Sequence, residues 1–227
     1  MLQIINGKFD ELVDDFRECG VELVFFKDIQ EEKLDLPETS ELLFENARIK
    51  AIAAAKHSGM YALGDDSGVF VEAIDWFPGV HSRRWIGEEE DDSLRNQRII
   101  QMLEEQNDSN RKATLVSRFA IADPDGNIIA EEKTSNVFNI STSERGNYGF
   151  AYDRILEVSP EWTNVTRKDL IKFQHATGYI RDNFKDHLPT IAELPQDIKN
   201  DFNQRGHIIA RSIKNKILKW EEQHEKN

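Results

Sequence analysis

The sequence has a single cysteine, Cys19, among its 227 residues, so an internal disulfide is impossible. Proteins that depend on disulfides carry several cysteines, and we expect this chain to work in the cytoplasm. It also lacks any apolar run approaching the length of a membrane span, about 20 residues. The N-terminal stretch Met1–Lys8 is too short and too soon polar for a signal peptide. These absences predict a cytoplasmic protein that has no membrane partner.

Basic residues are also scarce. Lysine and arginine number 29 against 42 aspartates and glutamates, which gives a formal net charge of −13. Proteins that bind nucleic acids in general need a basic surface, so we expect no nucleic-acid partner. A nucleotide can still bind in a local basic cleft. The hydrophobic fraction of 39% is enough for a core at this length, which predicts one large domain or two small lobes.

What the sequence does contain is an acid pair, Asp65-Asp66, in the stretch Ala62–Val71. Apolar residues on both sides predict a strand, a turn and a second strand, with Gly64 and Gly68 allowing close backbone approach. Adjacent carboxylates repel each other unless a cation is near, and Mg²⁺ takes oxygen ligands. An aspartate beside such a metal can orient or deprotonate a water. An ordinary hairpin turn, for which Asp-Ser-Gly is common, is the alternative interpretation.

Hydrophobic periodicity predicts the helices and strands of the rest of the chain. The expected helices cover residues 8–19, 39–57, 93–106 and about 167–173, followed by a C-terminal helix. The first has Phe9, Leu12, Val13 and Phe16 on one face, and the last has Ile209, Ile213, Ile217 and Trp220 on one stripe. The expected strands cover residues 2–5, 21–26, 113–122 and 137–141, with a turn at Asp123–Asn127 before the last of them. Thr39 or Ser40 is expected to cap the second helix. That helix also carries Glu45, Arg48 and Lys50, and one interpretation of these residues is a solvated face with local ion pairs.

Two further glycine-marked stretches carry candidate binding residues. Phe77–Trp85 contains Pro78-Gly79 and the pair Arg83-Arg84, which either clamps phosphate oxygens or covers a surface. Gly146–Asp153 contains aromatics suited to stacking on a base and an acid suited to reading it; the alternative is a set of core aromatics beside a turn. The isolated histidines show no metal-ligand spacing, and we assign them no role.

Four blocks, in this order, resemble the inosine triphosphate pyrophosphatase family. Phe44–Ala51 is similar to the family helix F-x-E-N-A-x-x-K-A, and Asp65–Gly68 followed by Pro78–Arg84 is similar to D-D-S-G and P-G-V-x-S-x-R. Gly149–Asp153 is similar to G-F-G-Y-D. Ala192-Glu193-Leu194 with Lys199 and Arg205 is similar to A-E-L, a lysine and S-H-R. Each block alone is a weak signal, but four in the family's order are a strong one.

The resemblance implies an α/β fold with an elongated mixed sheet flanked by helices, and two lobes with the active cleft between them. It implies a homodimer that hydrolyses nucleoside triphosphates, such as ITP or XTP, to the monophosphate and pyrophosphate with Mg²⁺. Glu45 and Asp66 then resemble metal ligands, with Asp66 activating water and Asp65 assisting. The residues that resemble substrate contacts are Lys8, Ser67, Arg84, Phe150, Tyr152, Asp153, Lys199 and Arg205. These parts suit the chemistry, because phosphoanhydride hydrolysis is mostly positioning and charge neutralisation.

The sequence also departs from the family pattern. The family opens with T-x-N-x-x-K, but Gln3 and Ile5 stand where the threonine and asparagine belong. Gln204 stands in place of the histidine before the final arginine, and Ala151 in place of the second glycine of G-F-G-Y-D. Two alternatives therefore stay open. One is a nucleotide-binding or regulatory protein with little catalysis, and the other is a hydrolase of a different nucleotide.

Residues 155–190 form a longer link than the family has between its last two blocks. Aromatics such as Trp162 and Phe173 argue against disorder, and the basic residues of the segment suit a polyphosphate ligand. We predict a small helical insertion at 155–190 within a single pyrophosphatase-like domain, 1–227. It is expected either to close over the nucleotide or to extend the dimer contact.

Overall fold

A mixed β-sheet forms the centre of the fold. The structure is a computed structural model that describes residues 2–5, 9–25, 39–87, 91–106, 109–149, 151–158, 170–202 and 205–224. Within these residues the sheet has seven strands in the order β2-β1-β3-β5-β6-β7, with β4 paired to β3. The strands are β1 (Leu2–Ile5), β2 (Leu23–Phe25), β3 (Tyr61–Val71), β4 (Phe77–Gly79), β5 (Lys112–Ala122), β6 (Ile128–Ile140) and β7 (Leu156–Val158). β1 is parallel to β2 and β3, whereas β4 is antiparallel to β3 and β7 is antiparallel to β6.

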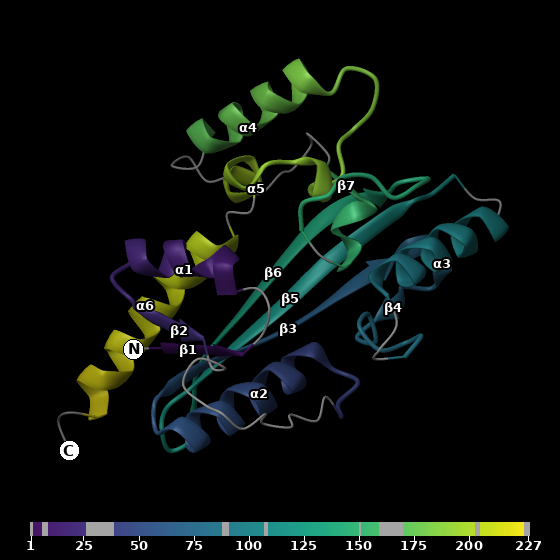
Figure 1. The fold of residues 1–227 in the computed structure, drawn as a ribbon. Helices are drawn as coiled ribbons and strands as arrows, with labels where there is room; N and C mark the ends of the chain where they lie inside the picture. Colours follow the sequence, from purple (N-terminus) through teal and green to yellow (C-terminus); the bar gives the residue numbers. More distant parts are fainter. Residues whose placement is uncertain are drawn as a thin grey trace. The chain divides into compact units, whose positions relative to one another are not determined.

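The described residues also form helices, drawn as coiled ribbons in Figure 1. They are α1 (Phe9–Glu18), α2 (Leu43–Ser58), α3 (Asp92–Glu105), α4 (Leu170–Asn183), α5 (Gln196–Phe202) and α6 (Arg205–His224). Short 3₁₀ turns occur at η2 (Glu72–Ile74), η3 (Ala151–Arg154) and η4 (Ile191–Glu193). α1 lies beside α6, and α4 lies beside α5 (Figure 1). The α/β class expected from the sequence is confirmed.

Two compact units divide the chain. Unit 1 consists of Met1–Ser67, Ser117–Thr134 and Arg205–Asn227, and unit 2 consists of Gly68–Val116 and Ser135–Gln204. This division agrees with the expectation of two lobes. The arrangement of the lobes and the cleft expected between them stay predictions.

Different helices cover the two faces of the sheet in unit 1. One face is packed with large side chains, from α1, α6 and the strands: Leu12, Phe16, Leu63, Phe119, Ile121, Ile209 and Ile213. The other face is packed almost entirely with alanines, from α2 and the strands: Ala47, Ala51, Ala54, Ala55, Ala62, Ala120 and Ala122. Side chains alternate along a strand, so Ala62 faces α2 and Leu63 faces α1 and α6. The apolar stripes predicted for these terminal helices are confirmed.

Gly64 is the point where α2 meets β3 most closely. A Cβ atom added at Gly64 would lie 2.1 Å from the carbonyl oxygen of Ala47 and 2.7 Å from the backbone nitrogen of Ala51. The helix backbone therefore rests directly on the strand, and the small alanines of α2 make this approach possible. The contact therefore sets the distance between the polar residues of α2 and β3.

The core of unit 2 joins the sheet to α3 and α4. Its buried residues include Val69, Val71, Ile99, Leu103, Phe138, Ile140, Ile155, Leu156, Val158, Ala176 and Ile180. The helix expected inside residues 155–190 is present as α4, although residues 159–169, with Trp162, lie outside the described part. Ile155–Val158 belong to the sheet region, and the backbone nitrogen of Val158 donates to Pro189 O at 2.8 Å. Val158 and Pro189, which lie near the two ends of the segment 155–190, are therefore neighbours.

The chain does not turn at Asp65-Asp66. β3 continues without interruption from Tyr61 to Val71, so the predicted order of strand, turn and strand is wrong. Gly64 and Gly68 do not have positive φ angles. Both allow close approach instead, because a Cβ at Gly68 would lie 2.3 Å from Gly79 O. Glycines that suggested a turn are needed here to let other backbone segments pack against an extended strand.

Three other predicted boundaries differ from the structure. α2 is preceded by Leu42, which has no side-chain cap, and the hydroxyl of Ser40 instead accepts from the Leu42 amide at 3.1 Å. β2 begins at Leu23, two residues later than predicted. β6 begins at Ile128, nine residues before the predicted strand at 137–141, directly after the confirmed turn at Asp123–Asn127. Charged residues such as Glu131 and Lys133 on β6 interrupt the apolar pattern, so the strand predicted from the sequence was too short.

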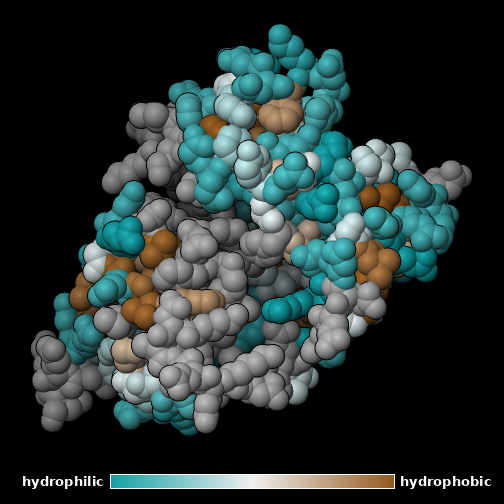
Figure 2. Space-filling model, in the orientation of Figure 1, coloured by the Kyte–Doolittle hydropathy of each residue, from teal (hydrophilic) through white to brown (hydrophobic). Residues whose placement is uncertain are grey.

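Among the residues that carry a hydropathy colour in Figure 2, hydrophilic ones predominate, which agrees with the high content of charged residues, 31%. Within the described part of the chain, no helix combines the length and the apolar character needed to cross a bilayer.

Candidate active site

Asp66 is held by two polar residues of α2. Lys50 Nζ lies 2.6 Å from Asp66 Oδ1 and also donates to Asp65 O at 3.2 Å, and Asn46 Nδ2 donates to Asp66 Oδ2 at 3.2 Å. Asp66 is 6% exposed and Lys50 4%. The interpretation of Lys50 as part of a solvated face is therefore wrong, and Arg48 forms its ion pair with the distant Glu131. A buried carboxylate needs such partners, since desolvation otherwise opposes its charge.

Asp65 points away from α2. It is 2% exposed, and its Oδ1 accepts from the hydroxyl of Ser67 at 3.0 Å. Ser67 Oγ also lies 2.8 Å from Ser117 Oγ on β5, on the side of the sheet that faces α1 and α6. The alternation of β3 thus separates the two carboxylates, and their repulsion does not call for a shared cation. The side chains of Asp65 and Ser67 lie on the same face of the sheet, whereas those of Asp65 and Asp66 lie on opposite faces.

Glu45 lies in the first turn of α2 and is exposed. Its carboxylate accepts a short hydrogen bond from the hydroxyl of Ser40. Asn46 connects this point to Asp66, because its amide donates to Ser40 O at 3.0 Å as well as to Asp66. Glu45 and Asp66 therefore belong to one hydrogen-bonded group at the start of α2.

The donor set at this group fits a divalent cation. Among the described residues, no three His, Cys, Asp or Glu side chains gather as a closed metal cage. Mg²⁺ does not need such a cage, because it is usually held by one or two carboxylates together with substrate phosphates. Each carboxylate oxygen has two lone pairs, so Asp66 can accept from Lys50 and Asn46 and still offer a lone pair to a metal. Glu45 supplies a second carboxylate with an exposed side chain.

Asp153 and Lys199 meet in unit 2, although 45 residues lie between them in the sequence. Lys199 Nζ lies 3.5 Å from Asp153 Oδ2 and donates to Tyr148 O at 3.0 Å. Gly149 makes this possible: its φ is +101°, and an added Cβ would lie 2.1 Å from Asp153 Oδ2 and 2.7 Å from Lys199 Nζ. The structure thus brings together two of the expected substrate contacts.

Tyr152 lies in the core of unit 2, at 8% exposure. Its hydroxyl donates to Ser82 O at 2.5 Å and accepts from Trp85 Nε1 at 3.1 Å. Burial raises the pKa of the Tyr152 phenol to about 12, against the hydrogen bond from Trp85. This placement favours the interpretation of Tyr152 as a core aromatic, which attaches η3 to the turn after β4.

The remaining expected contacts are less informative. Arg84 lies half-buried in the turn that follows β4, and Arg205 begins α6. Lys8 and Phe150 lie outside the described residues. Their roles stay predictions.

The sequence profile of the Ham1 family matches residues 6–214. The chain belongs to the Ham1 family. It is 31% identical over 209 residues to a dITP/XTP pyrophosphatase of Desulforamulus reducens, and the match covers 92% of this chain and 90% of that protein. A dITP/XTP pyrophosphatase of Mycobacteroides abscessus is 37% identical over 137 residues, which cover 60% of this chain and 65% of the relative.

A solved Ham1 structure has the same fold. The HAM1 protein from Coxiella burnetii superposes with a TM-score of 0.66 at 28% identity, over 96% of this chain and 99% of that one. Membership of the Ham1 family confirms the resemblance inferred from the four blocks.

Lys50 and Asn46 are the site residues that sequence reasoning missed, although both stand in the Ham1-like block Phe44–Ala51. A signal was present: the two are four residues apart and therefore share one helix face. That face also carries the buried residues Leu43, Ala47 and Ala54. Polar residues on a buried helix face need partners, and here the partner is Asp66.

Proposed function

We propose that this Ham1 family member is a Mg²⁺-dependent nucleoside triphosphate pyrophosphatase for deaminated purine nucleotides such as dITP and XTP. It adds water across a phosphoanhydride bond and releases the nucleoside monophosphate and pyrophosphate. The observation that carries the proposal is the buried carboxylate of Asp66, held by Lys50 and Asn46. The names of the relatives, dITP/XTP pyrophosphatases, support the substrate class.

Asp66 and Glu45 are the residues that would hold the metal. A bound Mg²⁺ would neutralise phosphate charge and polarise the reacting phosphoryl group. Asp66 orients the attacking water and accepts its proton. Lys50 balances the negative charge of Asp66, and Asn46 fixes the orientation of the carboxylate. Asp65, on the other face, is linked through its backbone carbonyl to Lys50 and supports the position of this group.

Asp153 and Lys199 are suited to the base of a deaminated purine. Such a base carries a carbonyl oxygen and a ring N–H where adenine carries an amino group and a bare ring nitrogen. A lysine can donate to the carbonyl oxygen, and an aspartate can accept from the N–H. This pairing would be mismatched with adenine, because donors would face donors and acceptors would face acceptors.

The direct test is a panel of nucleoside triphosphates incubated with Mg²⁺ and read out by pyrophosphate release. We expect dITP and XTP to be hydrolysed faster than dATP, with no release by the Asp66→Asn variant. Binding without pyrophosphate release would favour the alternative, a regulatory nucleotide-binding protein, which is suggested by the departures at Gln3, Ile5 and Gln204. Faster hydrolysis of another nucleotide would change the substrate class and leave the reaction in place.

Homodimer formation and a cytoplasmic location complete the proposal. Light scattering across a concentration series tests the dimer. Hydrogen exchange over the same concentration series tests the role of the segment 155–190, because a dimer contact predicts that residues 160–188 are protected from exchange more strongly as the protein concentration rises. A lid predicts instead that nucleotide protects the same residues from exchange when Ca²⁺ replaces Mg²⁺ to slow turnover.

A further inference from the structure

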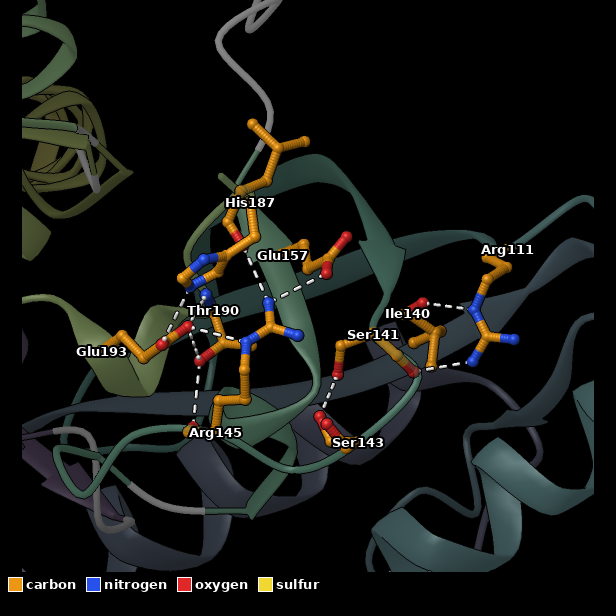
Figure 3. Close-up of polar contacts among 10 residues, drawn as sticks. Arg111, Ile140, Ser141, Ser143, Arg145, Glu157, His187, Thr190 and Glu193 are labelled. Atoms are coloured by element: carbon orange, nitrogen blue, oxygen red, sulfur yellow. Dashed lines mark hydrogen bonds and ion pairs between the residues drawn. The ribbon is translucent and has the colours of Figure 1, made fainter. Parts of the chain in front are cut away.

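Arg145 lies at the start of the segment 145–153, which supplies Asp153, and its side chain reaches the segment 188–199, which supplies Lys199. Its Nε donates to Glu193 Oε2 at 3.1 Å, and its Nη2 donates to Glu157 Oε1 at 2.9 Å and to Leu188 O at 2.8 Å. Figure 3 shows the guanidinium of Arg145 between Glu157 and Glu193. All three side chains are mostly buried, so these charge-assisted hydrogen bonds are stronger than exposed ones.

Two more hydrogen bonds join the same two segments. Thr190 Oγ1 donates to Arg145 O at 3.0 Å, and the amide of Tyr148 donates to Ala192 O at 2.9 Å. Gly146, with φ of +82°, lets the segments touch, because an added Cβ would lie 2.2 Å from Ala192 O. The two segments are therefore in direct contact along their length.

Glu193 is the most connected member of this group. Its Oε2 accepts from the Thr190 amide at 2.8 Å in a capping box at η4, and its Oε1 lies 3.2 Å from His187 Nε2 (Figure 3). Burial acts to raise the pKa of Glu193, but the hydrogen bonds from Thr190, Arg145 and His187 outweigh it and lower the pKa. The carboxylate is thus charged, and Arg145 is its strong partner.

A short path leads from Glu193 to Lys199. Glu193 ends η4, and α5 follows after two residues, with the amide of Lys199 donating to Pro195 O at 2.9 Å. The ammonium of Lys199 then returns to Tyr148 O, on the residue whose amide is held by Ala192. The contacts form a closed loop in which a shift of η4 would move Lys199 away from Asp153.

We propose that Arg145 is a positioning residue that, by holding Glu193, sets Lys199 against Asp153 and so determines nucleotide affinity and base selectivity. The inference deepens the proposed function and rests on it. Arg145 itself touches neither Asp153 nor Lys199 through a hydrogen bond among the described contacts, so its effect passes through η4 and α5.

Glu193→Gln and Glu157→Gln are a matched pair for the test. Each removes one carboxylate partner of Arg145, but only Glu193 lies on the segment that carries Lys199. We expect Arg145→Gln and Glu193→Gln to raise KM for dITP about tenfold, the loss expected for one charge-assisted hydrogen bond, with kcat within about twofold. Glu157→Gln should keep KM near the wild-type value. Equal effects of the two glutamate variants would overturn the proposal.

Two controls separate positioning from loss of stability. Arg111 also binds two backbone carbonyls, Ile140 O and Ser141 O, each at 2.6 Å, at the end of β6 (Figure 3). Arg111→Gln should lower Tm as Arg145→Gln does without raising KM. In a Lys199→Ala background, Arg145→Gln should change KM less than about twofold, because it acts through Lys199. Additive effects would contradict the inference.

Amide hydrogen exchange tests the inference without catalysis. We expect faster exchange in residues 145–149 and 188–199 of Arg145→Gln than in Glu157→Gln, with no nucleotide present. If the wild-type protein hydrolyses no triphosphate, the proposed function fails, and the exchange result alone decides whether Arg145 holds the segments. If the wild type is active and Arg145→Gln matches it in exchange and KM, the Arg145 inference fails alone.

Discussion

Asp65 and Asp66 are neighbours in the sequence, yet their carboxylates lie on opposite faces of β3. Asp66 binds Lys50 and Asn46 of α2, whereas Asp65 accepts from Ser67, which contacts Ser117. The extended backbone alone causes this separation, because successive side chains of a strand point to opposite sides. The two acids therefore cannot have equivalent roles, and their variants should behave differently.

Asp66→Asn should lower kcat by about a hundredfold or more, because asparagine cannot accept the proton of water. Asp65→Asn should lower it by less than about tenfold, because an asparagine oxygen can still accept from Ser67. Steady-state pyrophosphate release measures both. Similar losses in the two variants would contradict the assignment of Asp66 as the single base.

Lys50→Met should destabilise the fold by about 3–5 kcal/mol, because it leaves the buried carboxylate of Asp66 without its counter-charge. Adding Asp66→Asn should restore much of this stability, since no unpaired charge is then buried. Denaturant unfolding of the two single variants and the double variant gives the three free energies. The double variant should stay inactive. Recovery of stability without recovery of activity would separate the contribution of the Lys50–Asp66 pair to folding from its contribution to catalysis.

Gly64→Ala should cost about 1–3 kcal/mol, because its Cβ would overlap Ala47 O and force α2 away from β3. It should also lower kcat, since α2 carries Lys50 and Asn46. Gly59→Ala is the matched control at the end of the same helix. Its Cβ would meet open space, so only the φ of +68° opposes it, and kcat should be unchanged. Thermal unfolding and activity are compared for both.

Tyr152→Phe should cost about 1 kcal/mol near neutral pH, because Ser82 O and Trp85 lose a partner. The folded-state pKa is raised from 10.0 to about 12, so the protonated phenol stabilises the fold fully below pH 10 and this contribution is lost as pH rises toward 12. The stability difference between wild type and variant should therefore shrink over that range. A difference that stays constant from pH 9 to about 12 would contradict the buried phenol.

Glu45→Gln should raise the Mg²⁺ concentration for half-maximal activity by about tenfold or more, because a neutral amide is a weaker ligand for a hard cation. Glu41→Gln, four residues earlier and also exposed, should leave it unchanged. A Mg²⁺ titration of activity measures the effect. Activity of the wild type in excess EDTA would contradict metal dependence.

The sequence by itself determined the helices with clear apolar stripes, the turn between β5 and β6, and the family. Leu12 and Phe16 of α1, and Ile209 and Ile213 of α6, are buried as their spacing predicted. Such patterns depend on residues within a few positions of each other, and periodicity records them directly. The family blocks Phe44–Ala51, Asp65–Gly68 and Gly149–Asp153 likewise needed only their order along the chain.

Only the tertiary structure decided which partner each polar residue has. Lys50 looked like a solvated residue until α2 was placed on the strand that carries Asp66, and the glycines of β3 looked like turn residues until α2 and β4 were packed against them. Arg145 carried no signal, because its partner Glu193 lies 48 residues away. Contacts between distant segments depend on packing and desolvation, and local spacing does not encode either one.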